Sequence, residues 1–240
     1  HMCGHDGHMT MVASLAQHLK EKPISKGKVA LLFQPAEETG EGAEKVIGDR
    51  SFLEFKPDYI FGLHNIPGKK EGLILERRGT FCAGSVGLVI NLMGITSHAA
   101  HPENGINPGL AVAEIIQESS KLSNNKAHFE DLSFSTLIYT KIGEPAFGTS
   151  AGEAEMGFTL RAYKRNDLLK LKEMMTQLAA EIAQKNELEF GFNWVESFPV
   201  TTNKDEAQDI FYKTLDNSGL EHETLEGFSC DGLDTLLIPG

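Results

Sequence analysis

The first eight residues contain a high density of side chains that bind metals. Cys and His are the commonest ligands of zinc-like ions. Cys3 and His5 alternate across a glycine, so an extended or loop backbone can point both at one site. We therefore expect Cys3 and His5 to be metal ligands. His1 and His8, each taken singly, are more often surface histidines.

Two adjacent carboxylates, Glu37 and Glu38, follow a continuous apolar run at residues 29–33. Such a run is typical of a strand that is buried on both faces of a sheet. Ligands of α/β proteins gather at the carboxyl ends of such strands. One carboxylate can coordinate a metal there while the other accepts a proton from the water that the metal activates. An acidic helix N-terminus is the alternative interpretation.

His64 ends a second expected strand, at residues 59–63. A lone histidine in this place is more often structural. A two-metal site, however, needs further His or carboxylate ligands at the same sheet edge. The three features therefore support one another as parts of one site.

The elements that must position these residues alternate between helix and strand at first, with helices expected at 9–20 and 43–47. After residue 79 the apolar spacing predicts the order β-α-β-β-α-β, which is the ferredoxin-like pattern. Asn107 opens its first helix with Pro108 at the first position, and Asn166 or Asp167 caps its second, which runs to about 184. The four strands and a final helix are expected at residues 86–92, 133–141, 155–163, 188–195 and 206–215.

We therefore predict an α/β fold in which a compact α+β domain is inserted into a larger domain. The larger domain comprises residues 1–80 and 197–240, and its sheet is mixed, with helices on both faces. The inserted domain comprises residues 81–196. A strand near residues 86–92 is expected at the edge of the inserted sheet, where it could pair with its twin in a homodimer.

Composition excludes several classes of function. The net charge of −12 argues against a nucleic-acid surface, because phosphate binding needs clustered Lys and Arg. No run of about 18 apolar residues exists, so no membrane-spanning helix is expected. Three cysteines are too few for a disulfide framework, and their odd number fits a reducing compartment. We therefore expect a cytoplasmic protein.

Three motifs together resemble the metal-dependent amidohydrolases. They are Cys-Gly-His-Asp-Gly-His, Gln-Pro-Ala-Glu-Glu-x-Gly and Gly-Leu-His. This group includes N-acyl amino acid amidohydrolases, hippurate hydrolases and auxin-conjugate hydrolases, and it is related to carboxypeptidase G. The resemblance implies hydrolysis of the amide bond of N-acyl amino acids, with Glu37 as general base. It also implies two divalent ions (Zn, Mn, Co or Ni), held by Cys3, His5, Glu38 and His64.

The resemblance extends through the inserted domain, which it identifies as a lid or dimerisation domain. Ser97-His98-Ala99-Ala100-His101-Pro102 resembles the family's Gly-His-Ala-Ala-x-Pro. It implies that His98 binds substrate or stabilises the oxyanion, often across a dimer interface. Thr159-Leu160-Arg161 resembles a strand whose arginine, here Arg161, pairs with the substrate carboxylate. A surface turn histidine and a solvent-facing arginine are the alternatives. Residues 148–152 depart from the Asn-x-Ile-Pro segment that the family usually has there.

The family pattern also implies residues that the sequence does not contain. An Asp-bearing strand is expected before the Cys-Gly-His motif. A last histidine ligand is expected beyond the late acidic motif at 229–234 and the Pro-Gly turn at 239–240. Two other functions stay open: a related dipeptidase or aminopeptidase, and a non-catalytic metal- or peptide-binding relic of the same fold. Comparing the turnover of N-acyl substrates with that of free dipeptides distinguishes an amidohydrolase from a dipeptidase or aminopeptidase. Metal analysis distinguishes an enzyme from a non-catalytic relic.

Overall fold

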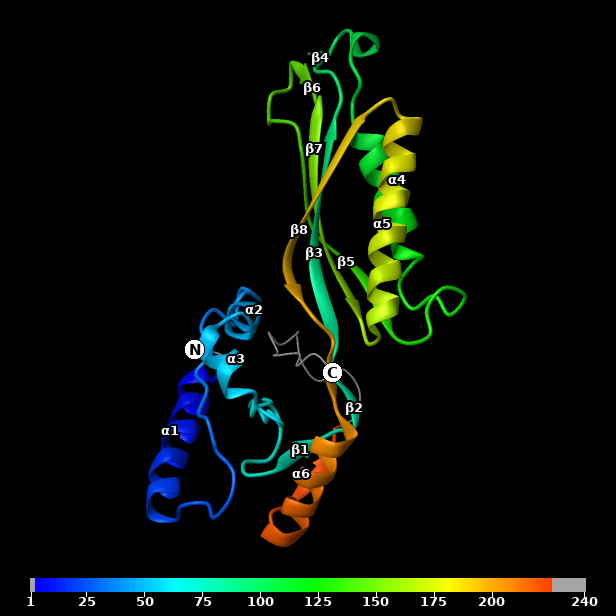
Figure 1. The fold of residues 1–240 in the computed structure, drawn as a ribbon. Coiled ribbons are helices and arrows are strands. Elements are labelled where there is room, and N and C mark those ends of the chain that lie inside the picture. Colours follow the sequence, from blue (N-terminus) through cyan, green and yellow to red (C-terminus); the bar gives the residue numbers. More distant parts are fainter. Residues whose placement is uncertain (1–2, 226–240) are drawn as a thin grey trace. The chain divides into compact units, whose positions relative to one another are not determined.

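A computed structural model describes residues 3–225 of the 240-residue chain. These residues form two compact units, one made of 3–79 and 202–225 and the other of 80–201. Figure 1 shows the elements of both. The chain passes between the units near β2 (Gly79–Cys82) and β9 (Thr201–Asn203). None of the helices in residues 3–225 combines the length and the apolar character that crossing a membrane requires.

The unit of residues 80–201 is a four-stranded antiparallel sheet with two helices on one face (Figure 1). The strand order is β5-β7-β3-β8, and the order along the chain is β-α-β-β-α-β, as the apolar spacing predicts. The shorter elements β4 (Ser97–His98), β6 (Thr149–Ser150) and η1 (Pro102–Asn104) complete the unit. The main elements are β3 (Gly84–Met93), α4 (Gly109–Ser120), β5 (Ser133–Ile142), β7 (Glu153–Ala162), α5 (Arg165–Lys185) and β8 (Glu189–Phe198).

The core of this unit lies between the sheet and the helices, because side chains alternate along each strand. On β3, Leu88, Ile90 and Leu92 are fully buried against α5 residues such as Leu171 and Met175. Burying each of these side chains contributes about 1.5–3 kcal/mol. The alternate apolar residues from which β3 was predicted are therefore the ones that face the helices.

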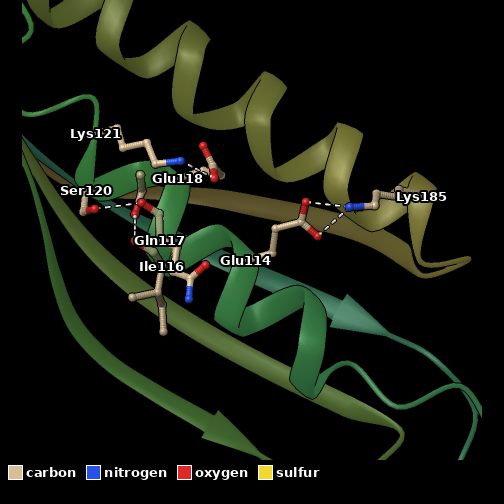
Figure 2. A network of polar contacts seen from close by, with 8 residues as sticks. Glu114, Ile116, Gln117, Glu118, Ser120, Lys121 and Lys185 are labelled. Atoms are coloured by element: carbon tan, nitrogen blue, oxygen red, sulfur yellow. Dashed lines mark hydrogen bonds and ion pairs between the residues drawn. The ribbon is translucent and has the colours of Figure 1, made fainter.

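Polar contacts join the two helices on the solvent side of that core (Figure 2). Lys185 Nζ donates to both carboxylate oxygens of Glu114, at 2.7 and 3.0 Å, which links the end of α5 to α4. Lys121 pairs with Glu118 at 2.5 Å at the C-terminal end of α4. These exposed pairs contribute at most about 1 kcal/mol each, and only the Lys185–Glu114 pair links the two helices.

Strand β3 lies inside the sheet, paired with β7 on one side and β8 on the other. The prediction that the strand near residues 86–92 is an edge strand is therefore wrong. The burial of four alternate side chains of β3 shows that one face is covered, whereas the inner position is given by its pairing with both β7 and β8. The edges of this sheet are β5 and β8.

The two helices of this unit begin close to their predicted starts but with different caps. Asn107 Oδ1 accepts a hydrogen bond from Gly109 N at 2.8 Å, so it does serve the first turn of α4. Helix α5 begins earlier than predicted, with Lys164 as its N-cap and no capping side chain. The buried Asp167 carboxylate instead accepts from the backbone N–H groups of Glu130 and Asp131, at 3.2 and 3.0 Å. Asp167 therefore anchors a loop and does not cap the helix.

The other unit contains α1 (His5–Glu21), α2 (Gly42–Ile47), α3 (Arg50–Phe55) and α6 (Asp205–Ser218). Its two short strands, β1 (Ile74–Glu76) and β10 (His222–Thr224), pair in parallel. Glu76 is 4% exposed and accepts hydrogen bonds from Tyr212 and Thr224. This buried carboxylate therefore joins β1 to α6 and β10.

The strands predicted at residues 29–33 and 59–63 are not formed. A strand needs a neighbour that accepts and donates its backbone hydrogen bonds. Within residues 3–225 neither run is hydrogen-bonded to another strand. Phe33 and Phe61 are accordingly 50% and 57% exposed. The prediction that residues 29–33 form a strand buried on both faces is therefore wrong, as is the prediction of a strand at 59–63.

Two of the three cysteines lie in the described part of the chain. Cys3 is free. Cys230 and the late acidic motif at 229–234 lie outside the described residues, as does His1.

Candidate metal centre

Side chains from three separate segments meet in the unit that contains residues 3–79. They come from the start of α1, from the turn at residues 35–40 and from the segment that ends in His64. Cys3, His5 and Glu38 form one group in which the possible ligand atoms all lie within 4.8 Å of one another. His5, His8 and His64 form a second such group. The two groups share His5, so the four ligands expected from the sequence lie in one cluster.

A left-handed glycine sets the geometry of the first segment. Gly4 has φ 73° and is the N-cap residue of α1, which begins at His5. The predicted extended or loop backbone through His5 is therefore wrong, and the helix starts four residues before the predicted residue 9. The sequence concealed this start because Gly4 offers no capping side chain and Gly7 is a poor helix former. Because His5 and His8 are three residues apart on the helix, they share one face.

The second segment is a tight turn that presents two carboxylates. Ala36 has φ 50°, a conformation that costs a non-glycine residue energy and persists only where the surroundings hold it. Gly40 N donates to Glu37 O at 2.9 Å, and Thr39 Oγ1 donates to Ala36 O at 3.2 Å. A Cβ at Gly42 would lie only 1.6 Å from the Pro35 carbonyl oxygen, so α2 packs directly against the turn.

The two glutamates of this turn differ in their surroundings. Glu38 belongs to the group with Cys3 and His5, and its side chain is 67% exposed. Glu37 lies outside both groups and is 24% exposed, yet its Oε2 is 3.4 Å from His5 Nε2. One carboxylate is thus placed among the possible ligands and the other beside them.

The third segment holds His64 in a defined tautomer. His64 Nδ1 lies 2.8 Å from the carbonyl oxygen of Asn65. A carbonyl oxygen can only accept, so Nδ1 carries the proton and Nε2 keeps its lone pair. A backbone carbonyl on one ring nitrogen is the usual arrangement around a histidine that binds metal through the other.

His8 is closer to the cluster than a surface histidine would be. Its ring centroid lies 4.7 Å from that of His64 and 5.6 Å from that of His5. Its Nε2 lies 2.9 Å from Asn65 Oδ1 and 3.0 Å from Asn65 N. His8 and Asn65 are the residues of this centre that sequence reasoning missed. A helix that begins at His5 places His8 on the same face as His5, and this i, i+3 spacing is the sequence signal for His8.

Burial and neighbouring groups shift the pKa of two of these side chains, Cys3 and His8. The hydrogen bond to Glu38, followed by burial, raises the pKa of the Cys3 thiol above its ordinary value. Burial, followed by the proximity of His64, lowers the pKa of His8. A divalent ion at this place would favour the Cys3 thiolate instead, because a bound cation reverses the local balance of charge.

The donor set fits divalent ions such as zinc. Thiolate, imidazole and carboxylate are the ligands that zinc prefers, at about 2.0–2.3 Å. Two ligands of one ion are therefore at most about 4.6 Å apart, so groups with atoms within 4.8 Å need only small side-chain adjustments. Two groups that share one histidine offer room for more than one ion.

His98 and Arg161 belong to the other unit. His98 is exposed at the end of β4, and its Nδ1 accepts a hydrogen bond from Ala100 N at 3.1 Å. A neutral His98 therefore carries its proton on Nε2, where it is a donor. Arg161 lies on β7 between the buried residues Leu160 and Ala162, so its side chain leaves the sheet on the face away from α4 and α5.

Comparison with known proteins identifies the family of this chain. A family model described as Peptidase family M20/M25/M40 matches residues 1–235. Relatives include IAA-amino acid hydrolase ILR1-like 4 of Arabidopsis thaliana, 33% identical over 229 residues, covering 92% of this chain and 51% of the relative. Hippurate hydrolase of Campylobacter jejuni is 30% identical over 210 residues, covering 88% of this chain and 54% of the relative. The chain therefore spans about half the length of these relatives.

A solved structure shows the same mixed α/β fold. The crystal structure of a Bacillus subtilis protein described as a dinuclear metal binding peptidase from the M20 family has a TM-score of 0.78 and 25% identity. The match covers 98% of this chain and 59% of that one. Sequence, fold and donor cluster lead to one assignment. The chain belongs to Peptidase family M20/M25/M40.

Proposed function

We propose that this chain is part of an enzyme that hydrolyses the amide bond of N-acyl amino acids with the help of two divalent ions. The observation that carries the proposal is the meeting of Cys3, His5, Glu38 and His64 in one cluster, with Glu37 beside it. The names of two relatives, a hippurate hydrolase and an IAA-amino acid hydrolase, support amides of amino acids as substrates.

The proposed ligands of the two ions are Cys3, His5, Glu38 and His64. The similar Bacillus subtilis protein is a dinuclear metal-binding peptidase, which supports a two-ion centre here. Zinc, manganese, cobalt or nickel would suit this mixture of thiolate, imidazole and carboxylate, and availability decides among them. When bound, such ions supply Lewis-acid chemistry that activates water and polarises the scissile carbonyl.

Glu37 is the proposed general base. It lies outside the ligand groups but within 3.4 Å of His5, so it can stand next to the reacting water without being a ligand. Its carboxylate accepts the proton of the attacking water. It then donates that proton to the leaving amine nitrogen as the C–N bond breaks.

His98 and Arg161 are the proposed substrate-binding residues. The hydrogen bond from Ala100 N leaves His98 with an Nε2–H, which is the donor that a developing oxyanion needs. Arg161 carries the fixed fork of N–H donors that matches the free carboxylate of an N-acyl amino acid.

The organisation of the complete protein is part of the same proposal. We propose that residues 81–196 act as a ferredoxin-like lid or dimerisation domain, inserted into a catalytic domain that comprises 1–80 and 197–240. A homodimer would form through an edge strand of this domain, β5 or β8, because unpaired edges invite pairing with a second copy. A cytoplasmic location also belongs to the proposal. A monomer by light scattering would remove the dimer.

Hydrolysis of a substrate panel by the full-length protein tests the function. The panel contains N-acetyl and hippuryl amino acids on one side and free dipeptides on the other, with and without a chelator. We expect chelator-sensitive turnover of the N-acyl compounds. Turnover of dipeptides alone would favour a dipeptidase, to which the peptidase name of the Bacillus subtilis protein lends support. If the wild-type protein neither binds metal nor turns over any substrate, the remaining interpretation is a non-catalytic relic of the same fold.

A further inference from the structure

The backbone of Asn65 connects His8 to His64. Its carbonyl accepts from His64 Nδ1 at 2.8 Å, and its N–H donates toward His8 Nε2 at 3.0 Å. The two peptide groups that flank Asn65 are therefore held from both ends by ring nitrogens. Of these two rings, only His64 is among the proposed metal ligands.

The direction of the Asn65 N–H decides the tautomer of His8. A backbone N–H has a fixed direction because the peptide is planar. It points at His8 Nε2, so this nitrogen must present its lone pair. The Asn65 side chain also lies 2.9 Å from Nε2, but its amide can turn to present N–H instead of oxygen. His8 therefore holds its proton on Nδ1.

A nitrogen whose lone pair already receives a backbone N–H is not available to coordinate an ion. His8 is near the ligand atoms of His5 and His64, yet its Nε2 is used by the backbone. We propose that His8 is a positioning residue for the metal centre, and that it acts through the Asn65 backbone to orient His64. The inference rests on the proposed metal centre.

The packing around Asn65 supports this role. A Cβ on Gly4 would lie 2.9 Å from the side-chain amide of Asn65, so the start of α1 packs directly against this residue. His8 sits one helical turn further along, with its ring 4.7 Å from that of His64. The first turn of α1 thus supplies both a proposed ligand, His5, and the support for another, His64.

Metal affinity of the intact protein tests the proposal. His8→Gln retains an acceptor oxygen for the Asn65 N–H, whereas His8→Leu retains size without an acceptor. His18→Leu, at an exposed position further along α1, is the matched control. We expect His8→Leu to weaken zinc or cobalt affinity by about 10–100-fold, the usual effect of removing support from a ligand. His8→Gln should recover most of the loss, and both variants should still bind the wild-type number of ions at saturation.

Three outcomes would overturn the proposal. If both His8 variants bind one ion fewer and change the Co(II) absorption spectrum alike, His8 is a ligand. If His8→Leu loses thermal stability but binds metal like the wild type, its role is only structural. If the wild-type protein binds no metal, the proposed function fails and takes this inference with it. The second outcome, in contrast, leaves the proposed function intact.

Nitrogen NMR of the wild-type protein gives a test that needs no variant, and so it stands even if His8→Leu does not fold. We expect His8 to show a protonated Nδ1 and a bare Nε2 in both the metal-free and the zinc-bound protein. A protonated Nε2 in the metal-free protein, or a metal-shifted Nε2 in the zinc-bound protein, would contradict the assignment.

Discussion

The Nε2 of His5 lies close to both carboxylates of the Glu37–Glu38 pair, 3.4 Å from Glu37 Oε2 and 3.7 Å from Glu38 Oε1. One proposed ligand thus touches both a second proposed ligand and the proposed base. The tight turn at residues 35–40 makes this possible, because it presents two adjacent side chains to the same histidine. Because Glu37 and Glu38 have different proposed roles, single substitutions can distinguish the two roles.

Glu37→Gln and Glu38→Gln should have different effects. Glu37→Gln should keep the metal content and lower kcat by two to four powers of ten or more, because only the proton acceptor is removed. Glu38→Gln should lower metal affinity first, because a charged ligand is lost. Metal analysis and steady-state kinetics of both variants check this. A Glu37→Gln enzyme with wild-type kcat would refute the assignment of the base.

Gly42→Ala should disturb the turn that carries these carboxylates. The added Cβ would lie 1.6 Å from the Pro35 carbonyl oxygen, so the turn or α2 must move. Overpacking of this kind costs about 1–3 kcal/mol, and here it should also weaken metal binding. Gly48→Ala at the end of the same helix is the control, because its nearest contact is an ordinary 3.6 Å. Equal metal affinity and stability in the two variants would contradict the role of the turn.

Sequence patterns predicted the unit of residues 80–201 better than the other unit. The alternation of Leu88, Ile90 and Leu92 predicts a half-buried strand. The strand forms, and the two strands that pair with it, β7 and β8, belong to the same unit. The runs at 29–33 and 59–63 are also apolar, yet neither pairs with another strand within residues 3–225. The apolar pattern of a short segment therefore does not by itself establish that the segment forms a strand, because a strand also needs a neighbouring strand to pair with.

The candidate centre was predictable in composition but not in geometry. The types and order of Cys3, His5, Glu38 and His64 were enough to predict that they would meet. The support of His64 was not predictable, because it uses the backbone of Asn65, and backbone groups leave no mark on the sequence. Asp167 was misassigned for a similar reason, since its hydrogen-bond partners are backbone amides 36 and 37 residues away.

Asp167→Asn should destabilise the unit of residues 80–201 although it preserves shape. Each carboxylate oxygen accepts one backbone N–H, and an amide would turn an NH2 group toward one of these donors. Hydrogen bonds to charged groups contribute about 1.5–3 kcal/mol each, so we expect a loss of about that size. Urea unfolding followed by the fluorescence of Trp194, the sequence's single tryptophan, reports on this unit. The exposed Glu173→Gln on α5 is the control, and equal midpoints would contradict the prediction.

Tyr212 should make the unit of residues 3–79 and 202–225 sensitive to alkali. Burial, followed by the hydrogen bond to Glu76, raises the pKa of Tyr212 above its ordinary value of 10.0. The folded protein therefore holds the phenolic proton more tightly than the unfolded chain does. This stabilisation is fully present below the ordinary pKa and is lost as the pH rises through the folded-state pKa.

Tyr212→Phe tests this linkage. The variant removes a donor from Glu76, which is only 4% exposed and would keep the hydrogen bond from Thr224 at 2.8 Å. We expect it to lose about 1–3 kcal/mol at neutral pH, the cost of leaving a buried acceptor short of a partner. Its stability should then decline less than that of the wild type above about pH 10. Urea titrations by circular dichroism measure both effects, with the exposed Tyr59→Phe as control. A Tyr212→Phe protein that loses stability in alkali as steeply as the wild type would show that another group is responsible.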